Sequence, residues 1–127
     1  MSAQALLVVF SNAVEGADEE FNRWYNTTHS PDIVKLGVAV SFTRYKASGV
    51  PLMAGIPEPA RYAVIYEITA TTVEGVQQAA AILKEGLEAG QTDISPSMDL
   101  TSVQAAWLLP ITDHVVGEPQ EPAKAPL

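Results

Sequence analysis

A nearly unbroken apolar run close to the N-terminus, residues 5–11, restricts the possible folds more than any other stretch of the chain. It reads ALLVVFS, without the polar position at every second residue that marks a strand with one side in solvent. The run is typical of a β-strand buried on both faces, which needs a covering layer on each side. Because it is far too short to span a bilayer, we interpret it as a first strand and not as a signal or membrane segment.

Periodicity indicates five further elements. Apolar residues recur at three- and four-residue spacing in an amphipathic helix and at every second position in a half-buried strand. Two later stretches have helical spacing and three have strand character, with glycine or proline clusters between several of them. In chain order they predict a helix over residues 18–29, strands over 38–47 and 62–69, a helix over 73–87 and a strand over 101–109.

The first helix is expected to begin with Asp18 as its cap, since an aspartate oxygen can accept hydrogen bonds from the free N–H groups of the first turn. Pro31 disfavours α conformation at Ser30, so this helix should end near His29. A separate short turn over residues 32–36 should follow. The buried stripe of the helix is predicted to be Phe21, Trp24, Tyr25 and Thr28.

The order strand, helix, strand, strand, helix, strand is that of a split βαβ unit. It predicts an α+β, ferredoxin-like βαββαβ domain over residues 1–110, with a four-stranded antiparallel sheet. Two helices cover one face of such a sheet, yet these strands carry apolar side chains on both faces. We therefore expect a homodimer whose sheets pack face to face into an α+β barrel. Residues 111–127 are rich in proline and predict an extended or disordered tail.

Two local patterns complete the organisation. The tetrapeptide TTVE at residues 71–74 is a capping-box signature for the second helix, and Gly90 is expected to end that helix. Residues 48–60 contain three glycine or proline clusters and little periodicity, so they predict a loop of more than average length.

Charge and composition narrow the class of partner. The 15 acidic and 7 basic residues give a formal net charge of -8, which argues against nucleic acid or an anionic membrane surface. A small-molecule ligand fits better. Cysteine is absent, which excludes a disulfide framework, a thiolate nucleophile and cysteine-based metal sites, and is compatible with a cytoplasmic location. The glycines form neither a phosphate-binding loop nor a dinucleotide fingerprint, and we expect no cofactor.

The segment WYNTTHSPD, residues 24–32, combines an aromatic pair with asparagine, histidine, proline and aspartate. Together with the later strands SFTRYKA and YAVIYEIT, it resembles the EthD-like branch of the dimeric α+β barrel superfamily, over roughly residues 6–109. The resemblance implies a ferredoxin-like monomer and a barrel-forming dimer. Relatives in the wider superfamily include lactone isomerases, polyketide cyclases, decarboxylases and monooxygenases.

The catalytic candidates are His29, Tyr25 and Asp32. His29 comes first because its usual pKa near neutrality lets it take and give a proton; alternatively, it caps a helix C-terminus. Tyr25 lies one helical turn earlier and should share its face. Asp32 could orient the imidazole, or could simply stabilise the N-terminus of the short turn. Asn26 could donate to a substrate carbonyl or bond locally near the helix end.

Most of the other candidates for substrate binding lie on strands. Tyr45, Tyr62 and Tyr66 could line a cavity and offer phenol hydroxyls to a ligand, or could pack in the core. Arg44 would select an anionic ligand if it faced the cavity. Its simplest alternative is a cross-strand ion pair with Glu67.

These residues favour cofactor-independent proton transfer, in which an apolar cavity shifts a histidine or tyrosine pKa and stabilises an enolate. The first hypothesis is a small-molecule isomerase, cyclase or decarboxylase that acts on a carbonyl compound, with His29 as general acid-base. The second is a non-catalytic ligand-binding or structural dimer. The third is a monooxygenase on the same fold. No metal is expected, because the spacing of His29 and His114 matches no metal-binding pattern.

Overall fold

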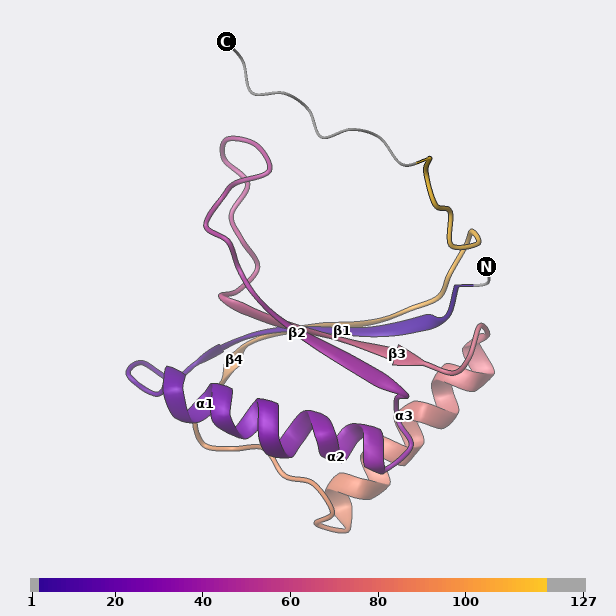
Figure 1. Ribbon diagram of the computed structural model, residues 1–127. Helices are drawn as coiled ribbons and strands as arrows, with labels where there is room; N and C mark the ends of the chain where they lie inside the picture. Colours follow the sequence, from indigo (N-terminus) through magenta and orange to yellow (C-terminus); the bar gives the residue numbers. More distant parts are fainter. Residues whose placement is uncertain (1–2, 119–127) are drawn as a thin grey trace.

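The computed structural model describes residues 3–118, which form one β-sheet with helices packed below it (Figure 1). All six predicted helices and strands are present in the predicted order, although several bounds differ by a few residues. A π-helical segment, η1, additionally joins two short α-helices. The elements are β1 (Ala5–Ala13), α1 (Asp18–Trp24), η1 (Tyr25–His29), α2 (Ser30–Lys35), β2 (Ser41–Lys46), β3 (Tyr62–Ile68), α3 (Val73–Glu88) and β4 (Met98–Leu108).

The sheet has the strand order β2-β3-β1-β4, and every neighbouring pair is antiparallel. The helix formed by α1, η1 and α2 and the helix α3 both lie on one face of this sheet. The arrangement is the topology of the ferredoxin-like α+β fold, so the predicted fold class is confirmed. The β1–β4 pairing is irregular at one point. Phe10 pairs with Gln104 and Asn12 with Asp99, so β4 has extra residues there in a bulge.

The two faces of the sheet differ in their surroundings. On β1, Leu7 and Ser11 are buried on the face toward the helices, which we call the helix-covered face. The alternating residues Leu6, Val8 and Phe10 point to the opposite side, the open face. Within residues 3–118 no helix covers the open face (Figure 1). Among residues 3–118, the cover that the apolar run requires is therefore present on one side only.

The hydrophobic core lies between the helix-covered face and the helices. Its largest fully buried members are Tyr66 and Phe21, and Phe21 contacts the rings of Tyr25 and Tyr62 at centroid distances of 5.2 and 5.4 Å. The buried hydrophobic residues are Ala5, Leu7, Ala13, Phe21, Trp24, Tyr25, Ile33, Val38, Ala39, Val64, Tyr66, Ile68, Ala79 and Met98. The aromatic segment at residues 21–25 thus supplies much of the core volume.

The predicted helix break at Ser30 and Pro31 is wrong. Both residues are helical, and α1, η1 and α2 form one continuous helix from Asp18 to Lys35. The reason is the wide π turn, in which the N–H of Ser30 bonds the carbonyl oxygen of Tyr25, five residues back. Pro31, which has no N–H to donate, directly follows this wide turn inside the helix.

The π turn also changes which residues face the core. The predicted stripe ended with Thr28, but Thr28 is exposed and the buried positions are His29, Ser30 and Ile33. An extra residue in one turn rotates the following residues relative to a plain α-helix. His29 and Ile33 keep a four-residue spacing from Tyr25, whereas the buried Ser30, five residues after Tyr25, is a position that α-helical spacing does not select.

Helix ends agree with the sequence in part. Gly37, at a φ of +88°, follows α2, and the Val38 N–H bonds the Ile33 carbonyl, as in a Schellman motif. Thr72 caps α3 by accepting a bond from the Gly75 N–H, one residue later than the predicted capping box. Asp18 is not a cap but the first residue of α1. Its carboxylate instead accepts a hydrogen bond from the hydroxyl of Tyr62 on β3.

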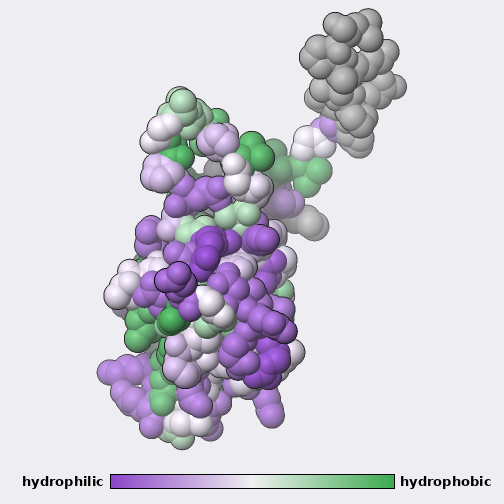
Figure 2. Space-filling model, turned by 90° about the vertical axis from the view of Figure 1, so that its left-hand side faces the viewer, coloured by the Kyte–Doolittle hydropathy of each residue, from purple (hydrophilic) through white to green (hydrophobic). Residues whose placement is uncertain are grey.

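The connection between β2 and β3 contains no helix or strand, as predicted for residues 48–60, and projects away from the helices (Figure 1). Val50, Leu52 and Met53 in this loop are exposed by 75%, 88% and 60%. Figure 2 shows hydrophobic residues gathered on this projection, above a largely hydrophilic body. The predicted tail falls partly on residues 119–127, which lie outside the described residues. No helix within residues 3–118 is long and apolar enough to cross a bilayer.

Candidate functional site

A pocket of about 280 Å³ lies between the helix-covered face of the sheet and the helices. It brings together three of the predicted site residues, Tyr25, His29 and Tyr66. Apart from the indole of Trp107, the rest of its lining is aliphatic or methionine. Those residues are Leu7, Val9, Ile33, Leu83, Ile94, Met98, Leu100, Val103 and Ala105. We call this the apolar pocket.

His29 occupies a closely packed position in the wall of this pocket and is only 7% exposed. Its ring stacks on Trp24 at a centroid distance of 4.6 Å and meets the edge of Tyr25 at 5.3 Å. Its Nδ1 atom lies 3.2 Å from the Oγ1 atom of Thr92. Burial lowers the pKa of His29 from 6.5 to about 4, against the opposing charge of Asp32 and the hydrogen bond and charge of Asp93. The imidazole is therefore neutral at pH 7.

These surroundings bear on the structural roles considered earlier: a helix C-terminal cap for His29, and for Asp32 a residue that orients the imidazole or stabilises a helix N-terminus. His29 does not cap a helix C-terminus, because the helix continues through it to Lys35. Within residues 3–118, Thr92 and not Asp32 makes the side-chain hydrogen bond that orients the imidazole. Asp32 acts on His29 only through its charge, from a half-buried position in the first turn of α2. Because that turn follows η1 in one continuous helix, Asp32 does not lie at a free helix N-terminus, and the alternative role is not met either.

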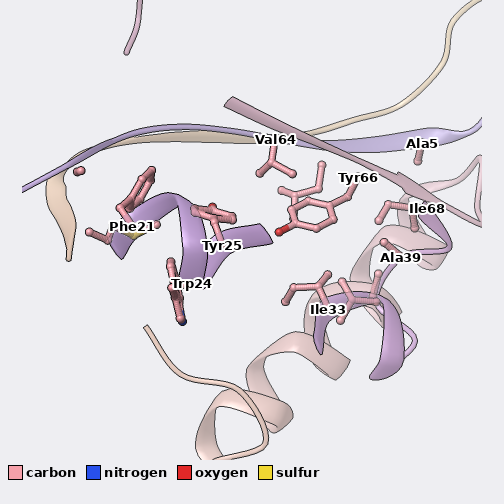
Figure 3. Close-up of a cluster of buried hydrophobic side chains, with 14 residues drawn as sticks. Ala5, Phe21, Trp24, Tyr25, Ile33, Ala39, Val64, Tyr66 and Ile68 are labelled. Atoms are coloured by element: carbon pink, nitrogen blue, oxygen red, sulfur yellow. The ribbon is translucent and has the colours of Figure 1, made fainter. Parts of the chain in front are cut away.

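Two buried phenols face the pocket beside His29. Tyr25 is 2% exposed, and burial raises its pKa to about 12, against the opposing charge of Arg44 and a hydrogen bond with Ser11. Burial also raises the pKa of Tyr66, whose hydroxyl lies 2.9 Å from the Ser30 hydroxyl. In Figure 3, the oxygen of Tyr66 points toward the helical segment that carries Tyr25. Both phenols are therefore neutral hydrogen-bond donors at pH 7.

The remaining predicted substrate-binding residues gather elsewhere. A second pocket of about 290 Å³ lies where β2, the edge strand of the sheet, meets the first helix. We call it the edge pocket, and it is lined by Asn22, Asn26, Arg44, Tyr45, Lys46 and Tyr62. The buried ring of Tyr25 contacts the guanidinium of Arg44 and also lines the apolar pocket. The predicted site is therefore divided between two pockets with a tyrosine between them.

Arg44 does not pair with Glu67, so that prediction is wrong. The two residues lie on opposite faces of the sheet, because Arg44 turns toward the helices and Glu67 toward the open face. Arg44 Nη1 instead donates to the Oδ1 atoms of Asn22 and Asn26 at 2.9 and 2.8 Å. Asn26 thus binds a strand residue, rather than the backbone near its own helix end.

Tyr45 and Tyr62 line the edge pocket in different ways. The Tyr45 side chain is about half exposed. The Tyr62 hydroxyl donates to Asp18 at 2.7 Å, and Arg61 forms an ion pair with the same carboxylate at 3.5 Å. The hydroxyl of Tyr62 is therefore committed to tying β3 to the start of α1.

Three residues of the site were not predicted. Thr92, Ser30 and Ser11 each place a buried hydroxyl next to one of the titratable side chains. Serine and threonine are common in loops and at helix starts, so their composition carries no signal of such a role. A search for pairs of hydroxyl and titratable residues would need the three-dimensional contacts, since Thr92 lies 63 positions from His29.

No group of three or more metal-ligating side chains occurs within residues 3–118. His114 lies in the exposed segment after β4, whereas His29 lies under the sheet. One histidine is exposed and the other is buried, so substitution of His114 is a useful control for substitution of His29.

Comparison with known proteins gives one similarity in structure. No protein-family model matches the chain, and no curated protein matches it. A solved structure of an EthD-like protein from Ralstonia eutropha JMP134 is similar, with 23% sequence identity and a TM-score of 0.42. The match covers 78% of this chain and 90% of that one. The similarity concerns the fold and nothing beyond it.

Proposed function

We propose that the chain binds a small, mainly apolar carbonyl compound in the apolar pocket. There it removes a proton from the carbon next to the carbonyl and returns it to the substrate. The observation that carries this proposal is the lining of that pocket. Nine aliphatic or methionine side chains surround three proton-bearing ones, Tyr25, His29 and Tyr66. A mostly apolar cavity with a few convergent polar groups is typical of a small-molecule site.

The proposed chemistry assigns one role to each group. The neutral imidazole of His29 accepts a proton from the carbon α to the carbonyl, and the electron pair of the broken C–H bond moves into an enolate. A phenol hydroxyl of Tyr25 or Tyr66 donates to the enolate oxygen. If Ser30 donates to the oxygen of Tyr66, the phenol proton of Tyr66 is left for this purpose. Return of the proton to another carbon would complete an isomerisation.

Deuterium exchange into an enolisable bicyclic ketone, 2-tetralone, tests this function. In D₂O, NMR should show loss of the α-proton signals faster with the protein than in buffer alone. His29→Gln should lower the protein-dependent rate by about 100-fold, the range for loss of a general base. His114→Gln, which removes the exposed histidine, should leave the rate unchanged. Equal rates for the two variants would remove His29 from the mechanism.

A second function, ligand binding without turnover, is favoured by the strongly lowered pKa of His29. An imidazole with a pKa of about 4 is a weak base, and its ring is already held by Trp24 and Thr92. Fluorescence of Trp107, which lines the apolar pocket, reports binding separately from exchange. Saturable quenching by 2-tetralone without faster exchange would support a binding protein, and absence of both would contradict a site for this ligand class.

We also propose that the chain forms a homodimer through its open face. The support is the row of apolar side chains that the helices leave uncovered, including Leu108 at 45% exposure. Val8, Phe10, Ala106 and Leu108 also line a shallow groove of about 280 Å³ on this face. Burying such a surface against its own copy removes apolar area from water, which is the usual driving force for association.

The dimer proposal predicts a mass of about two chains of 13.5 kDa by light scattering at micromolar concentration. Val8→Lys, which places a charge in the centre of the open face, should yield a folded monomer because an unpaired interfacial charge is costly. Leu87→Lys, near the end of α3 and 38% exposed, is the matched control and should remain dimeric. A monomeric mass for the unmodified chain would contradict the proposal.

A further inference from the structure

The edge pocket concentrates positive charge in an acidic molecule. Arg44 and Lys46 are two residues apart on β2, so both side chains leave the same face of the strand. Both line the pocket, and none of the lining residues is acidic. In a chain with 15 acidic and 7 basic residues, this is a local reversal of the overall charge. A pocket of this kind attracts anions.

The guanidinium of Arg44 is held in a way that leaves donors at its edge. Its central carbon, Cζ, lies 4.5 Å from the centroid of the Tyr25 ring. Both hydrogen bonds that the group makes within residues 3–118 use Nη1, so Nη2 is the donor left for a ligand, whereas Nε is buried. The planar fork of N–H groups on a guanidinium matches the paired oxygens of a carboxylate or phosphate.

Asn22 and Asn26 add neutral donors to the same pocket. They are four residues apart and therefore share one face of the helix. Because a guanidinium can only donate, the side-chain oxygens of both residues must be the atoms that face Arg44. Within the described part of the chain, their NH₂ groups make no hydrogen bond and can donate to another acceptor. The pocket offers a fixed guanidinium, an ammonium and two amide groups.

We propose that the edge pocket binds a compact oxyanion, a carboxylate or phosphate group, through Arg44, Lys46, Asn22 and Asn26. This site does not depend on the function proposed for the apolar pocket. Tyr25, which is 2% exposed, lines the apolar pocket and contacts Arg44 of the edge pocket. Because the two pockets share no lining residue, we assign the anion site to a second molecule, rather than to the charged end of a ligand in the apolar pocket.

NMR titration of ¹⁵N-labelled protein with malonate and with inorganic phosphate tests the proposal, with chloride used to keep the ionic strength constant. The side-chain amide signals of Asn22 and Asn26 should shift and saturate with at least one probe. The probe with the tighter binding identifies the preferred oxyanion. Similar shifts with chloride alone would indicate screening and not a site, which would overturn the proposal.

Three variants separate binding from structure. Asn26→Asp keeps an acceptor for Arg44 but removes a donor and adds a negative charge, so binding should weaken by at least about tenfold. Lys46→Gln should weaken binding by a similar factor. Lys84→Gln, which removes an exposed charge on α3, should leave binding unchanged. Equal affinities for all three variants would show that Asn26 and Lys46 do not bind the anion, which would overturn the proposed site. Because the readout is the amide signals, failure here is distinct from failure of ketone exchange.

Discussion

Lowering the pH from 7 to 5 should destabilise the native protein by about 2 kcal/mol through His29 alone. The unfolded chain binds a proton at this residue near pH 6.5, whereas burial lowers the folded pKa to about 4. Between these values the unfolded state holds more protons, so the free energy of unfolding falls as the pH falls. The stabilisation is fully present above pH 6.5 and is lost progressively as the pH falls to 4. The total loss in the free energy of unfolding over this range is about 3 kcal/mol.

Urea denaturation at the two pH values measures this effect, and His29→Gln isolates it. The free energy of unfolding of His29→Gln should therefore vary by less than about 0.5 kcal/mol between pH 7 and pH 5. His114→Gln should keep the pH dependence of the unmodified chain. If His29→Gln retained the full dependence, the imidazole would not be excluded from water in the way that its contacts indicate.

Phe21→Ala should lower the free energy of unfolding by about 3–5 kcal/mol, the range for deletion of a fully buried phenyl ring. The side chain is 0% exposed and contacts Trp24, Tyr25 and Tyr62, and Arg44 lies 5.5 Å from its ring centroid. Removal leaves a cavity and also loosens the partners that position Arg44. Urea denaturation at a fixed protein concentration is the appropriate measurement, since dimerisation would make stability depend on concentration.

Tyr45→Ala serves as the control for this core substitution. It deletes an aromatic ring from a side chain that is 51% exposed, so its cost should be below about 1 kcal/mol. A Phe21→Ala cost as small as that of Tyr45→Ala would mean that the aromatic cluster does not form the centre of the core. Near-UV circular dichroism of both variants would show whether the tyrosine and tryptophan rings keep a fixed environment.

The order of the elements could be predicted because each depends on local periodicity. Alternation in residues 62–69 and the capped stripe of α3 are properties of neighbouring residues, and the topology follows from their order. The helix break at Pro31 was predicted wrongly because the rule on the residue before proline is a steric preference, and Ser30 adopts α conformation in spite of it, with φ -64° and ψ -41°. The π turn at residues 25–29 depends on tertiary packing of Tyr25 and His29, which no local pattern reveals.

Residue type alone indicated which side chains to consider for the candidate site. It did not indicate which of them would lie in the same pocket. His29, Tyr25 and Tyr66 were selected because histidine and tyrosine are chemically distinctive, and the structure places all three in the lining of one pocket. Arg44 was assigned to the same cavity or to an ion pair with Glu67, and neither is correct. Which pocket a strand residue joins depends on the tilt and packing of the helix above it, which the sequence pattern does not specify.

The wide turn of η1 has a consequence for comparing this chain with related ones. A π turn holds one more residue than an α turn, while the residues on either side keep their inward direction. Alignment with a homologue whose helix is regular should therefore need a gap of one residue between Tyr25 and His29. Without that gap, Asp32 would be matched with the buried position of Ile33, and an acidic residue would be mistaken for a core change.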